Sequence, residues 1–342
     1  MRRLLFLLAI SLGAFFVFSR IAELEQVIDS FREGDPAWLG LAIVVQFLWM
    51  VNITASFWVI YRILGIRERF FHLGLVVISA QFVSVVAPSG GMGGIAVLIA
   101  DGNKRGLRSG RVTTGGALFV FFEQFSLLAV VLLGLFFLFR LNQLSAASIL
   151  AVLVLAGIAL VTGLVLFMGM RSPVLLANVL TRLGTILNRM LQPILRRDSV
   201  DISRARPFAE DVYEGLQIVR KSPGKLLIPA ALAFSSKALL IAILGLIFVA
   251  FGQSFTISML IASFSIGYLF YIVSPTPSGI GFVEGAMTLV MTSLGLSLAV
   301  SAVITLTFRG VTFWLTVLYG MLTLRWVGLG QRAPAQSTEP LA

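Results

Sequence analysis

The chain has 342 residues, of which 58% are apolar and only 12% are charged, and its net charge is +11. Soluble globular domains carry about 25% charged residues, so the composition excludes a water-soluble domain and predicts an all-α integral membrane protein. The chain has no cysteine and one histidine, which argues against disulfide frameworks, His/Cys zinc sites, other metal centres and a Ser-His-Asp triad.

Six apolar runs are long enough to cross a membrane. A helix needs roughly 17 to 25 apolar residues to span the hydrocarbon core. The predicted spans are Arg3 to Phe18, Ala37 to Tyr61, Val112 to Phe139, Ser145 to Met170, Leu226 to Phe251 and Leu298 to Leu324. The first also resembles the core of a signal peptide, but no small-x-small cleavage pattern precedes the polar segment after Arg20, so we interpret it as a retained helix.

Two further apolar stretches, Leu73 to Ala100 and Ile257 to Gly295, are interrupted near their middle. The interruptions are Pro88–Gly94 and Ser274–Gly281, which are rich in proline and glycine. Proline lacks an N–H and glycine favours turns, and irregular backbone is tolerated at membrane depth only inside protein or beside a wet cavity. Each stretch therefore predicts a re-entrant helical hairpin.

The basic residues predict the topology. If the N-terminus is inside and both hairpins re-enter, 21 basic residues lie on the cytoplasmic side and three lie outside. This excess predicts a multi-pass protein of the cell (inner) membrane with both termini in the cytoplasm. The positive charge thus reports topology and gives no reason to expect nucleic acid as a partner.

The hairpins predict an internal repeat, because Pro88-Ser89-Gly90 recurs as Pro277-Ser278-Gly279 and a long span follows each copy. The topology gives the copies opposite orientations, as in the inverted repeats of many transporters. Two unrelated Pro/Gly kinks remain the alternative. The predicted units are an N-terminal two-helix segment (1–66), repeat 1 (67–144), two spans flanking a basic loop at 171–225 (145–251), repeat 2 (252–325) and a polar tail (326–342).

Four ionisable residues, Glu123, Lys237, Glu284 and Arg309, lie in or beside apolar stretches. A charge at the centre of a span costs roughly 2.5 to 3.5 kcal/mol, so such residues face the protein interior and are functional candidates. A structural Glu123–Arg309 ion pair is the alternative, as is a Lys237–Glu284 pair. Glu284 also lies three residues after Gly281, where it is placed to cap a half-helix.

The returning half-helices predict an anion site, because each begins near the midplane with unpaired N–H groups. The candidate substrate-binding backbone lies at Ser89, Gly90, Gly91, Gly93, Gly94, Ser278, Gly279 and Gly281, with Arg309 as a clamp. Phosphate-bearing lipid head groups fit this chemistry. The first bend lacks the Gly-Lys-Ser/Thr ending of a nucleotide-binding loop, so no nucleotide or other cofactor is expected.

The loop at 171–225 carries ten basic residues and a helical pattern of apolar ones. It predicts a helix at an anionic lipid surface, where it gathers substrate or simply anchors the chain. A second amphipathic stretch has Phe208, Val212, Leu216 and Val219 on one side. His72, beside Arg67, Glu68 and Arg69, is interpreted as an interfacial anchor.

The segment from Thr276 to Glu284 resembles the Pro-Gly-Gly-x-Gly-x-x-Glu signature of the lysylphosphatidylglycerol synthase transmembrane region, the flippase domain of multiple peptide resistance factors. The resemblance covers roughly Arg67 to Arg325 and implies a two-repeat fold and movement of lipid between leaflets. It maps the buried acid and arginine of the family onto Glu123 and Arg309. Ser278 replaces the first glycine of the signature, Gln124 stands where a basic residue is expected, and the aminoacyl-transferase domain is absent.

The sequence therefore predicts a flippase-like transporter, not an enzyme, that moves a membrane phospholipid or polyprenyl lipid with an anionic head group. A secondary transporter of a small soluble anion is the alternative, and an intramembrane enzyme that uses Glu123 and Glu284 is a third. No ATP motif is present, so uphill transport requires an ion or the membrane potential, with Glu123 as the proton-coupling candidate. The sequence leaves open whether the chain forms a homo-oligomer.

Overall fold

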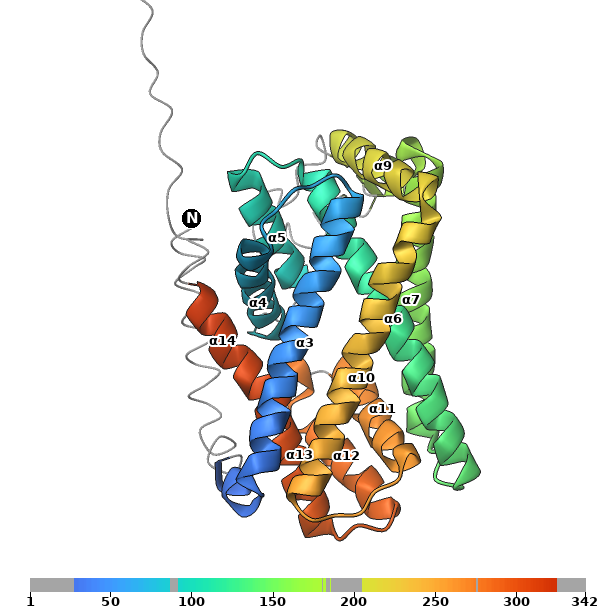
Figure 1. Cartoon of the computed structure of the whole chain (residues 1–342). Helices are drawn as coiled ribbons and strands as arrows, with labels where there is room; N and C mark the ends of the chain where they lie inside the picture. Colours follow the sequence, from blue (N-terminus) through green and yellow to red (C-terminus); the bar gives the residue numbers. More distant parts are fainter. Residues whose placement is uncertain are drawn as a thin grey trace, which may run out of the picture.

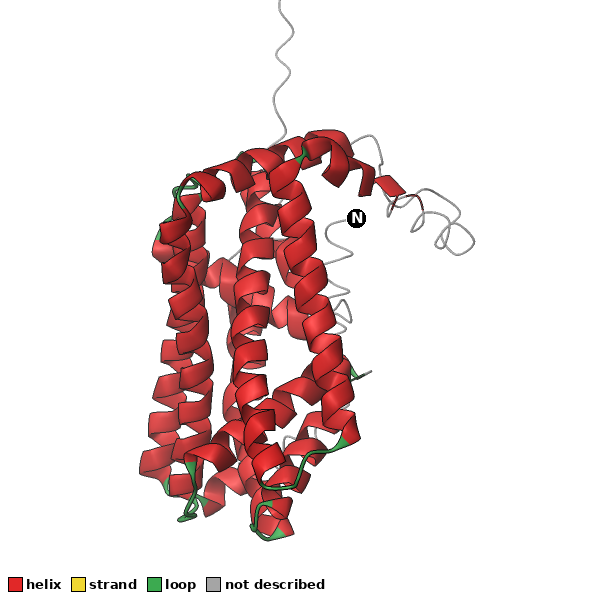
Figure 2. Cartoon of the chain, turned by 90° about the vertical axis from the view of Figure 1, so that its right-hand side faces the viewer, coloured by secondary structure: helices red, strands yellow, loops and turns green. Residues whose placement is uncertain are grey.

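A computed structural model describes residues 28–86, 92–179, 181–182, 185, 205–274 and 276–324. Within these ranges all regular structure is helical and no strand occurs (Figures 1 and 2). The predicted first span, Arg3 to Phe18, lies outside the described residues, as do Ser89, Gly90 and Gly91 of the first bend and the tail at 326–342.

Five of the described helical segments are long and apolar enough to cross a membrane. They are α3 (Pro36–Ile63), α6 (Ser109–Arg140), α7 (Ala146–Arg171), α10 (Leu227–Ala250) with the preceding turn η2 (Pro223–Leu226), and a composite of α13 (Leu298–Arg309), η4 (Gly310–Trp314) and α14 (Leu315–Leu324). These segments match five of the six predicted spans. Side chains such as Leu150, Leu153 and Leu160 on α7 are exposed, as expected for a face in contact with lipid.

Helix starts follow local capping rules. The Asp35 carboxylate accepts the Ala37 N–H at 2.8 Å, and Pro36 occupies the first turn of α3. Ser145 and Ser297 cap α7 and α13 in the same way, each accepting the N–H three residues further on. These caps bind N–H groups that have no partner inside the helix.

Each interrupted apolar stretch forms two short helices. The first gives α4 (Phe70–Val86) and α5 (Met92–Lys104), and the second gives α11 (Ile257–Val273) and α12 (Phe282–Ser293), with η3 (Pro277–Gly279) in the bend between them. The pair α4 and α5 lies in the upper half of Figure 1, and the pair α11 and α12 lies in the lower half. Neither pair continues as a single span.

Each pair packs on the long helical segment that follows the other pair: α4 lies against α14, and α11 lies against α6. Glycines allow both contacts. A Cβ at Gly320 would lie 2.2 Å from Phe82 Cβ, and a Cβ at Gly134 would lie 2.5 Å from Ser265 Cβ. At these glycines, each half of the molecule packs closely against the backbone of the other half.

Helix α9 (Ala205–Lys221), which lies between α7 and α10 in the chain, runs across the upper ends of the long helices (Figures 1 and 2). The predicted apolar side is confirmed, because Val212, Leu216 and Val219 are buried in the cluster shared with α6 and α7. Gln217 Nε2 donates to the Met170 carbonyl at 2.8 Å. The apolar face of α9 thus seals this end of the bundle.

Candidate functional site

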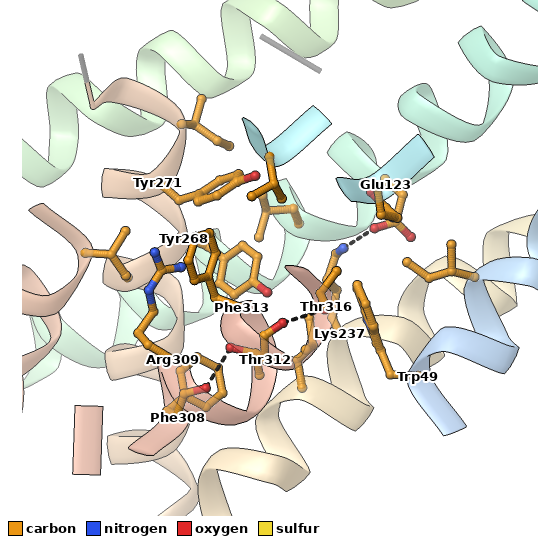
Figure 3. Close-up of a pocket in the computed structure, with 18 of the residues that line it drawn as sticks. Trp49, Glu123, Lys237, Tyr268, Tyr271, Phe308, Arg309, Thr312, Phe313 and Thr316 are labelled. Carbon is orange, nitrogen blue, oxygen red and sulfur yellow. Dashed lines mark hydrogen bonds and ion pairs between the residues drawn. The ribbon is translucent and has the colours of Figure 1, made fainter. Parts of the chain in front are cut away.

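A cavity of about 270 Å³ lies among α3, α4, α6, α10, α11, α12 and the α13–η4–α14 segment. Three of the four predicted ionisable residues line it: Glu123, Lys237 and Arg309. Figure 3 shows Arg309 on one side of the cavity and the Lys237–Glu123 pair on the other. Helices that are far apart in the sequence thus bring charged groups to one cavity.

Lys237 and Glu123 form an ion pair that joins α10 to α6. Lys237 is only 4% exposed, and its Nζ donates to Glu123 Oε2. The other carboxylate oxygen, Glu123 Oε1, is buried and has no hydrogen-bond partner. An unpaired buried acceptor is costly, so this oxygen is a point at which a ligand that donates a hydrogen bond would gain free energy.

Arg309 is held at the second bend. Its Nε donates to Glu284 Oε1 at 2.6 Å, and its Nη2 donates to the Ser278 carbonyl at 3.1 Å. The guanidinium lies over the Phe313 ring, with Cζ 4.3 Å from the ring centroid. These contacts fix the plane of the guanidinium, while Nη1 makes no hydrogen bond to any described residue.

The turn η4 determines where Phe313 stands. It is a π-helical turn directly after Arg309, and such turns are frequent at functional sites because they change the direction of side chains. Gln46 on α3, which is fully buried, donates to the Thr312 carbonyl at 3.3 Å and to Thr316 Oγ1 at 3.1 Å. α3 therefore holds the turn that places Phe313 under Arg309.

The second bend contains backbone strain. Ser278 has φ of 56°, in the left-handed region that disfavours every residue with a Cβ, at the position where the family signature has glycine. Its Oγ donates to the Val85 carbonyl at 2.9 Å, which ties this bend to the end of α4. Strain that persists because the surroundings hold it is typical of functional sites.

The predicted free amides of this bend are partly occupied. The Gly281 N–H donates to Glu284 Oε2 at 2.6 Å, and the Gly279 N–H donates to the Thr276 carbonyl at 3.1 Å. The capping interpretation of Glu284 is thus confirmed, and the same carboxylate also holds Arg309. In the first hairpin, a Cβ at Gly94 would lie 2.8 Å from the Ala80 carbonyl, so Gly94 lets α5 pack closely on α4.

The four ionisable residues pair differently from the predicted alternatives. The expected structural pairs were Glu123 with Arg309 and Lys237 with Glu284, whereas the structure pairs Glu123 with Lys237 and Arg309 with Glu284. The reason is position: Glu284 is anchored at the helix start below Arg309, and α10 brings Lys237 against α6. The Glu123–Lys237 pair lies on one side of the cavity, and the Arg309–Glu284 pair lies on the other.

Sequence reasoning missed Trp49, Gln81 and Tyr268, which line the cavity, and it noted Gln124 without assigning it to the site. Each is a polar or amphipathic side chain within an apolar helix, and only this pattern could have identified these residues from the sequence. His72, interpreted as an interfacial anchor, has its Nε2 3.1 Å from Asp101 Oδ2, so it also joins α4 to α5.

The chain is similar to a known family and to a protein of known sequence. The family model described as the lysylphosphatidylglycerol synthase TM region matches residues 4–320. A protein from Methanothermobacter thermautotrophicus, named a UPF0104 membrane protein, is 22% identical over 324 residues, which cover 93% of each chain.

Proposed function

The chain belongs to the lysylphosphatidylglycerol synthase transmembrane-region family, and on that premise we propose that it is a flippase-like transporter of a phosphate-bearing lipid. The family supports a lipid flippase-like role for a multi-pass membrane protein. The observation that carries the proposal is the cavity, because charged groups from both halves of the chain line it.

We further propose that α4–α5 and α11–α12 are re-entrant hairpins of an inverted repeat. The glycine contacts support this arrangement: Gly134 lies eleven residues after Glu123, and Gly320 lies eleven residues after Arg309. The first helix of the opposite hairpin packs against each of these glycines: α11 against Gly134 and α4 against Gly320. Unrelated kinks would not be expected to reproduce both the spacing and the reciprocal packing.

In the proposed mechanism the lipid phosphate binds Arg309 through Nη1, and the acyl chains stay in the bilayer. Glu284 keeps Arg309 in place between transport events. As the two halves rock about their glycine contacts, the head group is exposed to one leaflet and then to the other. Protonation of Glu123 would release Lys237, so Glu123 remains the proposed coupling site.

The proposed orientation places the α9 end in the cytoplasm. Arg62, Arg105, Arg108 and Arg111 lie at this end, and Arg108 Nη1 binds Glu214 of α9 at 2.9 Å. The basic loop at 171–225 would meet anionic lipid there, in agreement with the excess of cytoplasmic positive charge. Cysteine labelling from each side of the inner membrane would test this orientation.

The transport proposal is tested in proteoliposomes with fluorescent phospholipids, in which a membrane-impermeant quencher reports the leaflet. Wild-type protein should accelerate exchange between leaflets, and Arg309→Gln should reduce the rate at least tenfold. Arg140→Gln is the matched control, because Arg140 is exposed at the end of α6 and should behave as wild type. Wild-type rates in a correctly folded Arg309→Gln variant would refute the proposed site.

A secondary transporter of a soluble anion is the second candidate, because Arg309 would bind a free phosphate equally well. Uptake of labelled inorganic phosphate into the same proteoliposomes separates the two. Uptake without lipid exchange would favour the soluble anion and contradict lipid transport. An intramembrane enzyme would instead convert added lipid in detergent, which analysis of the lipid products would reveal.

A further inference from the structure

Resting on the proposed lipid transport, we infer that the transported head group is a phosphate-linked polyol or sugar, recognised mainly through its hydroxyl groups. The charged groups of the site are balanced. Lys237 and Glu123 neutralise each other, and Arg309 is neutralised by Glu284. These two pairs leave no net charge among the four residues, so a group attached beyond the phosphate gains no net attraction there from being strongly cationic or anionic.

The groups that remain unpaired in the cavity wall are hydrogen-bonding groups. Glu123 Oε1 and Gln124 Oε1 are buried without a partner. Gln81 and Tyr268 also line the cavity, and their side chains make no hydrogen bond to any described residue. The cavity thus contains one carboxylate oxygen, which accepts hydrogen bonds, and two amides and a phenol, each of which can donate and accept.

This mixture matches hydroxyl groups better than an ammonium group. A hydroxyl donates one hydrogen bond and accepts others, so a polyol can pair with the Glu123 oxygen and with the amides at once. An ammonium group only donates, so it would leave the amide N–H groups of Gln81 and Gln124 unpaired. It would also compete with Lys237 for the carboxylate.

The shape of the cavity agrees with this assignment. Its volume of about 270 Å³ is near the lower end of the range for small-ligand sites, which suits a head group. Trp49, Tyr268 and Phe313 contribute aromatic rings to the lining. The C–H groups of a polyol are weakly positive and pack well on the negative face of such rings.

The test uses proteoliposomes with four phospholipids of identical acyl chains: phosphatidylglycerol, phosphatidylinositol, phosphatidylethanolamine and phosphatidic acid. We expect the two hydroxylated lipids to exchange between leaflets at least fivefold faster than the other two. Equal or faster exchange of phosphatidylethanolamine or phosphatidic acid would overturn the inference and leave the proposed transport intact. Failure of all four lipids to exchange would overturn both.

A pair of variants tests the contact itself. Gln124→Met keeps the size of the side chain but removes its hydrogen-bonding groups. It should slow exchange of phosphatidylglycerol by about two- to tenfold, the effect of one hydrogen bond, and leave the slow rate for phosphatidic acid unchanged. Gln143→Met, at an exposed position after α6, is the matched control. An equal loss for both lipids in Gln124→Met would contradict recognition through the hydroxyl groups.

Discussion

Replacing Gly320 by alanine tests the close contact between α14 and α4. The new Cβ would lie 2.2 Å from Phe82 Cβ and 3.1 Å from the Ile78 carbonyl oxygen. Carbon atoms pack at about 3.5 Å, so the helices must part by about 1.3 Å. Neither Phe82 Cβ nor a backbone oxygen can rotate away, which places the overpacking cost near the upper end of about 1 to 3 kcal/mol.

Alanine also has a favourable effect, because it stabilises a helix relative to glycine by about 1 kcal/mol. The net expectation for Gly320→Ala is a loss of about 2 kcal/mol, measured as a lower thermal midpoint of the purified protein in detergent. Gly157→Ala is the control, since a Cβ at this position on α7 meets nothing within 4 Å. It should be neutral or stabilising, and equal midpoints for the two variants would refute the contact.

The reciprocal contact offers a suppressor. Gly134→Ala should destabilise the protein because its Cβ would lie 2.5 Å from Ser265 Cβ and 2.2 Å from Ser265 Oγ. Ser265→Gly removes both atoms, so the double variant should recover much of the lost stability. A double variant less stable than Gly134→Ala would contradict the close approach of α6 and α11.

Three further predictions concern single contacts; the first and third are measured by thermal unfolding of the purified protein, and the second by limited proteolysis. Lys237→Met leaves the Glu123 carboxylate buried without its partner and should lower the free energy of unfolding by about 3 to 5 kcal/mol. Adding Glu123→Gln to this variant should restore most of the lost stability. A double variant that recovers no stability would contradict the ion pair. Gly110→Ala should loosen α9, because its Cβ would lie 2.2 Å from Asp211 Cβ, and limited proteolysis should then cut α9 faster than in wild type. Asp35→Ala removes the cap of α3 and should cost about 1 kcal/mol, and an unchanged midpoint would show that the cap contributes nothing.

The sequence by itself determined the membrane class, five spans and the positions of the breaks. These features depend on local properties: the length of an apolar run, the absence of a proline N–H and the backbone freedom of glycine. The cap formed by Glu284 belongs to the same local class, whereas the positive φ of Ser278 was found only in the structure. The sequence also identified all four ionisable residues, because an isolated charge in an apolar run is conspicuous.

Only the tertiary structure decided which of those charges meet. Glu123 pairs with Lys237 because α10 lies beside α6, and Arg309 pairs with Glu284 because α13 brings it against the start of α12, where Glu284 caps the Gly281 N–H. The rotation of each helix about its axis depends on contacts such as that of Gly320 with Phe82, between residues far apart in the chain. Hydropathy does not record these contacts, so neither the pairing of the charges nor the cavity between the two pairs could be predicted before the helices were packed.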